Sequence, residues 1–257
     1  MLFDTHCHLN DGELYSHIDE VIENAKKTGV QKFLVVGYNK ESSFLAVEIA
    51  ERYPECYAAI GFHPCDIFDI SEDDYRETMS LVNHKKVVAI GEIGLDYHWI
   101  KEPEKKQLEK EYFIRQIEFA NEHKLPISIH NRESNEDCLN ILKEHTPKYG
   151  GVMHCYSGSV EMLSKVLNLG LMISLGGPVT FTNAKTPKEV AEVVPLDKLL
   201  LETDSPYLTP HPHRGEKNEP KYICLVSEEI AKLKGLSKKH VEQVTYENGL
   251  KLFKIDE

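Results

Sequence analysis

The chain alternates short apolar segments with helical segments, and this alternation limits its fold more than any other feature of the sequence. Gly, Pro or polar residues bound each apolar segment, as expected for strands. Because a parallel strand needs a crossover before the next strand, the alternation predicts successive βα units. We predict strands over residues 2–10, 31–36, 56–64, 86–96, 126–130, 151–154, 171–175 and 198–204.

Helical periodicity fills the segments between these strands. Eight alternating units without a low-complexity linker predict a (β/α)8 TIM barrel that forms a single domain over residues 1–257. A doubly wound open sheet is the alternative, but the strand count and the polar residues at strand ends in both halves favour the barrel. We predict helices over residues 19–28, 43–52, 71–83, 104–123, 133–145, 160–169 and 188–193, with two more beyond residue 220.

Net charge and cysteine usage restrict the class of protein. The formal net charge of -12 repels polyanions and offers no general binding face for duplex nucleic acid. The 6 cysteines include no Cys-x-x-Cys pair, which indicates reduced thiols rather than a disulfide framework. No apolar run approaches the roughly 20 residues of a membrane span, and no secretory leader is recognisable. We therefore expect a cytoplasmic monomer with no membrane partner.

Metal-binding side chains lie at the ends of several predicted strands. The spacing of His6 and His8 puts both imidazoles on one face of a strand, and neutral imidazoles bind transition metals. Ser128 and His130 likewise share one strand face. Because catalytic groups of barrels lie at the carboxyl ends of the strands, we expect these side chains to converge there. The set comprises His6, His8, His63, Glu92, His130, His154 and Asp204.

The size of this set predicts two metal ions. Even without His63, its four histidines and two carboxylates exceed the three protein ligands of a catalytic zinc. Two divalent ions, Mg, Mn or Zn, would activate a water molecule and stabilise an in-line displacement. We expect Glu92 to bridge them, because its strand lies between the first strand and the fifth and sixth. We expect Asp204 to bind the first ion and to hold or deprotonate the nucleophilic water.

Three further residues are candidates for substrate binding. Arg132 follows a strand that carries a ligand and is placed to bind a phosphate, or else to pair with Asp137. Arg214 lies in the loop after the eighth strand, where barrels often bind phosphate. Asn218, in the same loop, is either a substrate contact or a helix cap. The aromatic segment 97–99 either stacks on bases or packs the rim of the barrel.

Several motifs resemble the TatD-like metal-dependent hydrolases of the amidohydrolase-like superfamily. The segment Phe3-Asp4-Thr5-His6-Cys7-His8 is similar to the first signature of that family. Inner blocks of the family resemble residues 61–64, 91–97, 126–132 and 154–158, and residues 201–208 with 213–220 resemble its closing block. The resemblance therefore extends in family order over nearly the whole chain.

The resemblance implies a barrel that binds divalent metals and hydrolyses DNA, commonly from the 3′ end of single strands. It implies one metal held by His6, His8, Glu92 and Asp204 and another held by Glu92, His130 and His154. It also implies that the substrate phosphate meets His63, Arg132 and the loop from Arg214 to Asn218.

The sequence is also compatible with two other functions. The same metal chemistry hydrolyses small esters, lactones or amides, and the acidic net charge favours such a substrate. A metal-binding partner protein without activity is the other alternative, although every candidate ligand is present. A phosphotriesterase-like enzyme would carry a modified Lys where this chain has Glu92.

Overall fold

The computed structural model describes residues 1–256, which form a single-domain α/β barrel of eight parallel strands. The strands neighbour one another in chain order, and this confirms the predicted barrel over a doubly wound sheet. They are β1 (Leu2–Cys7), β2 (Val30–Val36), β3 (Cys56–Ile60), β4 (Val87–Asp96), β5 (Ile127–Arg132), β6 (Gly151–Met153), β7 (Met172–Leu175) and β8 (Leu199–Leu201).

Hydrogen bonds between β1 and the segment around β8 close the barrel. The Thr5 hydroxyl donates to the Leu201 carbonyl (2.8 Å), and the Asp204 N–H donates to the His6 carbonyl (2.9 Å). The buried Asp4 carboxylate accepts from both the N–H (2.9 Å) and the hydroxyl (2.6 Å) of Thr203. This closure places the residues that follow β8 beside His6 and His8 at the end of β1.

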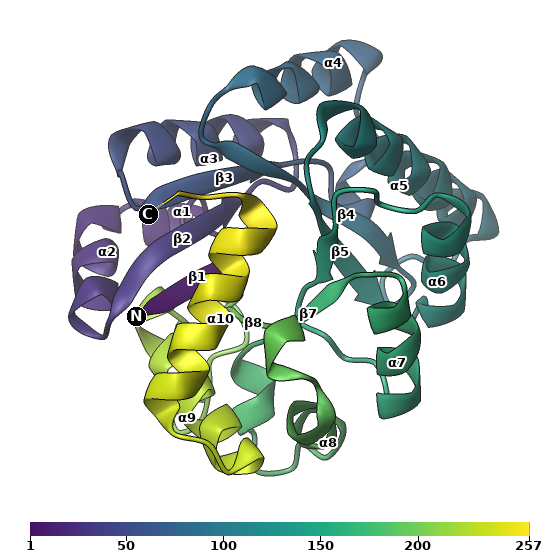
Figure 1. The fold of residues 1–257 in the computed structure, drawn as a ribbon. Helices are drawn as coiled ribbons and strands as arrows, with labels where there is room; N and C mark the ends of the chain where they lie inside the picture. The colour runs from purple at the N-terminus through teal and green to yellow at the C-terminus, as the bar shows by residue number, and fades with distance from the viewer. Residues whose placement is uncertain (257) are drawn as a thin grey trace.

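Helices surround the strands (Figure 1). The predicted helices are confirmed with shifted ends, and the short α1 is an addition. Its four residues are too few to display a helical period, although Asp11 caps it by accepting from the Glu13 N–H (2.9 Å). The helices are α1 (Gly12–Tyr15), α2 (Ile18–Lys27), α3 (Lys40–Arg52), α4 (Glu72–Ser80), α5 (Pro103–His123), α6 (Asn135–Glu144), α7 (Val160–Asn168), α8 (Thr186–Val193), α9 (Ile223–Lys234) and α10 (Lys238–Phe253).

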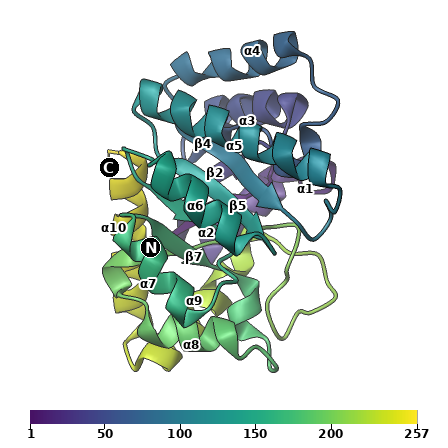
Figure 2. The ribbon, with the colours of Figure 1, turned by 90° about the vertical axis from the view of Figure 1, so that its right-hand side faces the viewer.

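Helix α10 covers one end of the barrel, in front of the strands in Figure 1. Tyr246 and Phe253 of this helix pack edge-on against the ring of Phe3, with centroids 6.5 and 5.9 Å away. These rings join a buried cluster from the inside of the barrel that includes Leu34 and Leu200. Figure 2 shows the loop after β8 extending from the side of the molecule opposite α10. One end of the barrel is thus packed with apolar side chains, and the other is free to carry polar groups.

Among residues 1–256, no helix combines the length and the apolar composition needed to cross a membrane.

Candidate metal centre

Glu92 lies at the middle of the polar end of the barrel. Its strand, β4, is buried along its whole length, and the Glu92 side chain is 6% exposed. Gly94 lets β4 approach β5 closely, since it has φ +149° and a Cβ there would collide with the His130 carbonyl oxygen. The close approach places the Glu92 carboxylate among imidazoles from four other strand ends. Each of its two oxygens faces a different group of ligand atoms.

The first group surrounds Oε2 of Glu92. The Nε2 atoms of His6 and His8 lie 3.5 and 3.8 Å from this oxygen. The same two nitrogens lie 3.8 and 3.5 Å from Oδ1 of Asp204. Ligand atoms about 2.1 Å from one ion lie roughly 3.0–3.4 Å from one another. The distances among these four atoms are slightly longer, so the atoms surround a space large enough for one ion.

The second group surrounds Oε1 of Glu92. Nδ1 of His130 and Nε2 of His154 each lie 2.8 Å from this oxygen and 3.3 Å from each other. The structure therefore brings together all six residues predicted as metal ligands. Glu92 offers one oxygen to each group, which is the arrangement that a bridging carboxylate requires.

Hydrogen bonds on the other ring nitrogens determine which nitrogen of each imidazole offers a lone pair. A carbonyl or carboxylate oxygen only accepts, so Nδ1 of His8 donates to the Val36 carbonyl (3.0 Å), and Nε2 of His130 donates to Asp96 (3.0 Å). The remaining nitrogens, Nε2 of His8 and Nδ1 of His130, face Glu92. Nε2 of His6 is buried without a hydrogen-bond partner. Such an atom between two carboxylates fits a bound cation.

His63 has the opposite arrangement. Its Nδ1 accepts a hydrogen bond from the backbone N–H of Cys65 (3.1 Å), so the neutral ring carries its proton on Nε2. Burial and the neighbouring His130 lower the pKa of His63 to about 3, so the ring is neutral at pH 7. Its Nε2 lies 3.8 Å from Oε1 of Glu92 and points into the site as a donor. Although His63, Glu92 and His130 are close enough to share an ion, His63 is better suited to donate a hydrogen bond.

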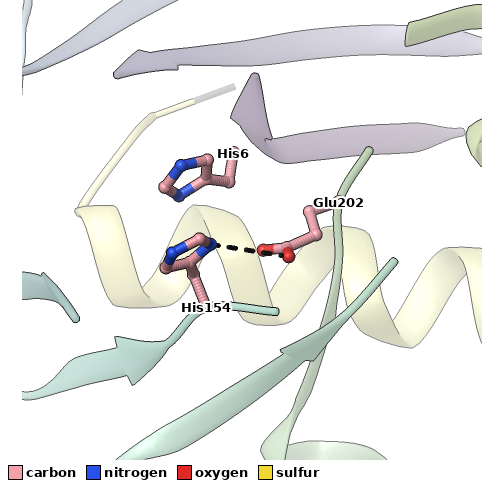
Figure 3. A group of neighbouring side chains, drawn as sticks. All are labelled: His6, His154 and Glu202. Carbon is pink, nitrogen blue, oxygen red and sulfur yellow. Dashed lines mark ion pairs between the residues drawn. The ribbon is translucent and has the colours of Figure 1, made fainter. Parts of the chain in front are cut away.

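A further set of close ligand atoms comprises His6, His154 and Glu202 (Figure 3). The buried Glu202 carboxylate accepts from the Cys155 N–H (2.7 Å) and from the Ser174 hydroxyl. Its Oε1 lies 3.7 Å from Nδ1 of His154, the ion pair drawn in Figure 3. Because Nε2 of the same ring faces Glu92, we interpret Glu202 as a residue that orients His154.

The electrostatics of the centre fit divalent cations. Burial raises the pKa of Glu92, but His154 and His63 lower it more, so the net pKa is well below its usual range. Burial also opposes ionisation of Asp204, yet His8 and His6 lower its pKa overall. Burial lowers the pKa of His154, but Glu92 and other carboxylates raise it well above its usual value. Protons on His8, His130 and His154, whose pKa values are raised, thus help to balance the carboxylates in the metal-free protein, and cations would replace them.

A cavity of about 560 Å³ opens above this centre. His8, Glu92, His154 and Asp204 line it, as do His63 and Arg132. Arg132 makes no ion pair with any residue of the described range 1–256. Asp137, the alternative partner for Arg132, is bound instead by Lys110 (2.7 Å) and by the Tyr97 hydroxyl (2.6 Å).

Two predicted substrate contacts lie outside this cavity. The exposed Arg214 stacks over the Phe181 ring, with its guanidinium carbon 3.7 Å from the centroid. Asn218 is fully buried, and its amide donates to the carbonyls of Thr203 (2.8 Å) and Tyr207 (2.5 Å). It therefore ties together the loop that follows Asp204 and is not a helix cap. We infer that any effect of Asn218 on substrate is transmitted through this loop.

Two residues of the site were not among those predicted from the sequence. Asp96 accepts the Nε2 proton of His130, and Glu202 pairs with His154. Both belong to segments that carried predicted ligands, four and two residues from Glu92 and Asp204 respectively. Strand alternation could have predicted Glu202 as a site residue, because Glu202 and Asp204 are two residues apart and so share one strand face, as His6 and His8 do.

The chain is similar over nearly its whole length to several known proteins. The family model described as TatD related DNase matches residues 3–254. The metal-dependent hydrolase YabD of Bacillus subtilis is 49% identical over 257 residues, with 100% of both chains covered. YcfH of Escherichia coli K12 is 38% identical over 260 residues, covering 99% of this chain and 96% of the relative. The crystal structure of YjjV, a TatD homolog from Escherichia coli K12, aligns with a TM-score of 0.93 at 28% identity, covering 99% of this chain and 98% of that one.

Proposed function

Because the chain belongs to the TatD family of metal-dependent hydrolases, within the amidohydrolase-like superfamily, we propose that it is a divalent-metal-dependent deoxyribonuclease. Its substrate is DNA with a single-stranded 3′ end, which it shortens in the 3′ to 5′ direction. The enzyme works as a cytoplasmic monomer. The observation that carries the proposal is the position of Glu92, with one oxygen in each of two groups of ligand atoms.

Six residues would hold the two ions. His6, His8 and Asp204 with Oε2 of Glu92 form one position, and His130 and His154 with Oε1 form the other. The imidazole-rich donor set favours a transition ion such as Zn²⁺ or Mn²⁺ over Mg²⁺, which prefers oxygen ligands. When bound, two such ions lower the pKa of water and neutralise the charge of the phosphate.

The other residues of the cavity bind and orient the phosphodiester. His63 donates from Nε2 to a phosphate oxygen, and the unpaired guanidinium of Arg132 binds the phosphate as a two-pronged donor. Asp204 is ionised, as its lowered pKa requires, and accepts the proton of the attacking water. Arg132 also offsets locally the acidic net charge of the chain.

The test uses 5′-labelled single-stranded DNA on a sequencing gel. The protein is stripped of metal and then supplied with Mn²⁺, Zn²⁺ or Mg²⁺, beside the Glu92→Ala variant. A matched control is Glu228→Ala, which removes an exposed carboxylate on α9. We expect a ladder that shortens from the 3′ end with the wild type and with Glu228→Ala, and no ladder with Glu92→Ala. Absence of a ladder with every metal would refute the nuclease.

A hydrolase of small esters, lactones or amides is the second candidate. The cavity of about 560 Å³ has the size of a small-molecule site, and the carboxylate of Asp66 lies on its wall. Hydrolysis of a nitrophenyl ester or a lactone, by a protein that leaves DNA intact, would establish this function instead.

A further inference from the structure

Trp99, the single tryptophan of the chain, lies on the wall of the metal cavity. Trp99 is 66% exposed, more than any other large hydrophobic residue within residues 1–256. An exposed aromatic ring on the wall of this cavity is available to contact a bound ligand. Packing of the barrel rim, the other interpretation of segment 97–99, does not account for this exposure.

Hydrogen bonds hold the backbone that carries the indole. Oδ1 of Asp96 accepts hydrogen bonds from the N–H groups of Trp99 (3.0 Å) and His98 (2.9 Å), while Oδ2 binds His130. The N–H of Tyr97 donates to the Arg132 carbonyl (2.8 Å). One carboxylate therefore fixes both a metal ligand and the loop that carries Trp99. The backbone of Trp99 therefore has a defined place beside His130.

The chemistry around Trp99 matches a nucleotide. The guanidinium of Arg132 lies 5.8 Å from the centroid of the Trp99 ring. Arg132 is also the single Lys or Arg among the described residues that line the cavity. A cation beside an exposed aromatic ring offers one contact for a phosphate and one for a base, and any base can stack on indole.

Part of the cavity wall is acidic. Asp66 lies there, and a second hollow that shares Asp66 is lined by Asp69 as well. Carboxylates repel phosphates. The charge of the wall therefore favours a nucleic acid that passes over Arg132 rather than over Asp66.

We propose that Trp99 is a substrate-binding residue that stacks on the base of the nucleotide beside the scissile phosphate. This inference rests on the proposed function, since it assumes a nucleic-acid substrate. It assigns the contact to the base rather than to the sugar or phosphate. The subsite accepts all four bases, because stacking requires no particular hydrogen-bond pattern.

Intrinsic fluorescence reports this contact directly, because all tryptophan emission of the protein comes from Trp99. The metal-loaded wild type is titrated with an eight-nucleotide, phosphorothioate-linked thymidine strand, which resists cleavage. We expect saturable quenching of the emission. An abasic strand of the same length should bind without comparable quenching. Equal quenching by both strands, or none by either, would overturn the assignment.

Kinetics provide the second readout. On single-stranded DNA, Trp99→Ala should raise KM about fivefold to a hundredfold with little change in kcat, and Trp99→Phe should recover part of the loss. Phe44→Ala, which removes another exposed ring on α3, should leave KM unchanged. If the wild type cleaves DNA and Trp99→Ala matches it in KM, the stacking subsite is wrong and the nuclease stands. If the wild type cleaves no DNA, the proposed function fails first.

Discussion

Replacement of Asp96 by Asn should weaken one metal position and spare the other. Asp96 is 1% exposed, and its two oxygens have different partners. Oδ1 accepts from the backbone of the loop, and Oδ2 accepts the Nε2 proton of His130. Asn keeps the shape and can keep the loop contacts with its carbonyl oxygen. Its amide nitrogen, however, is a donor and faces Nε2 of His130.

The proton of His130 must then move. An amide donor at Nε2 requires a lone pair there, which places the proton of the neutral ring on Nδ1. Nδ1 is the atom 2.8 Å from Oε1 of Glu92 and 3.3 Å from His154, where an ion would need a lone pair. Loss of an outer partner of a metal-bound histidine typically costs 10- to 100-fold in metal affinity, or about 1.4–2.7 kcal/mol. No hydrogen bond or ion pair joins Asp96 to the group formed by His6, His8 and Asp204.

Calorimetric titration of the metal-free protein with Mn²⁺ separates the two binding steps. Asp69→Asn is the matched control, because it removes the same charge from an exposed position near the cavity. We expect one step to weaken 10- to 100-fold in Asp96→Asn and neither step to weaken in Asp69→Asn. Equal weakening of both steps, or unchanged binding, would refute the role given to the His130 proton.

Three further predictions concern stability. Saturating metal, at about 100 times its Kd, should stabilise the wild type by about 2.7 kcal/mol per ion, which calorimetry would detect as a rise of roughly 5–10 °C in Tm. A similar rise in Glu92→Gln would contradict metal binding by Glu92. Burial raises the pKa of Glu109 on α5 to about 8, and neither carboxyl oxygen has a hydrogen-bond partner. The folded state therefore binds this proton more tightly than the unfolded chain, and its contribution to stability, full below about pH 4.5, is lost as pH rises toward 8. The free energy of unfolding of metal-free Glu109→Gln, relative to that of the wild type, should therefore rise by on the order of 3 kcal/mol between pH 5 and pH 8 in urea titrations. An equal difference between the two proteins at both pH values would contradict this. Asn218→Ala should lower the free energy of unfolding by about 1–3 kcal/mol, because the buried Thr203 carbonyl and the part-buried Tyr207 carbonyl lose their donor. An unchanged free energy of unfolding in urea titrations would contradict this.

The barrel and the convergence of the six candidate ligands were predictable from the sequence because both depend on local pattern. Strand alternation puts His6 and His8 on one face, and the carboxyl ends of parallel strands must meet at one end of a barrel. The eight strands and their order are confirmed by the structure. The sequence could not settle which oxygen of Glu92 faces which histidines, because this depends on the close approach of β4 and β5 at Gly94.

Residues whose role depends on contacts distant in sequence were harder to predict. The spacing of Asn218 suggested a substrate contact or a helix cap, but its amide is used by two carbonyls 15 and 11 residues away. Arg214 precedes it in a loop rich in His and Pro, yet it stacks on Phe181 from the segment after β7. The proton positions of His63 and His130 follow from one hydrogen bond each, to Cys65 and Asp96, and no sequence pattern records them.

Anomalous diffraction from crystals grown with Mn²⁺ would test the central claim most directly. We predict two anomalous peaks on either side of the Glu92 carboxylate, roughly 3.5–4 Å apart. One should lie among His6, His8 and Asp204, and the other between His130 and His154. A single peak, or a peak bound by Glu202 in place of Glu92, would contradict the bridged two-metal centre.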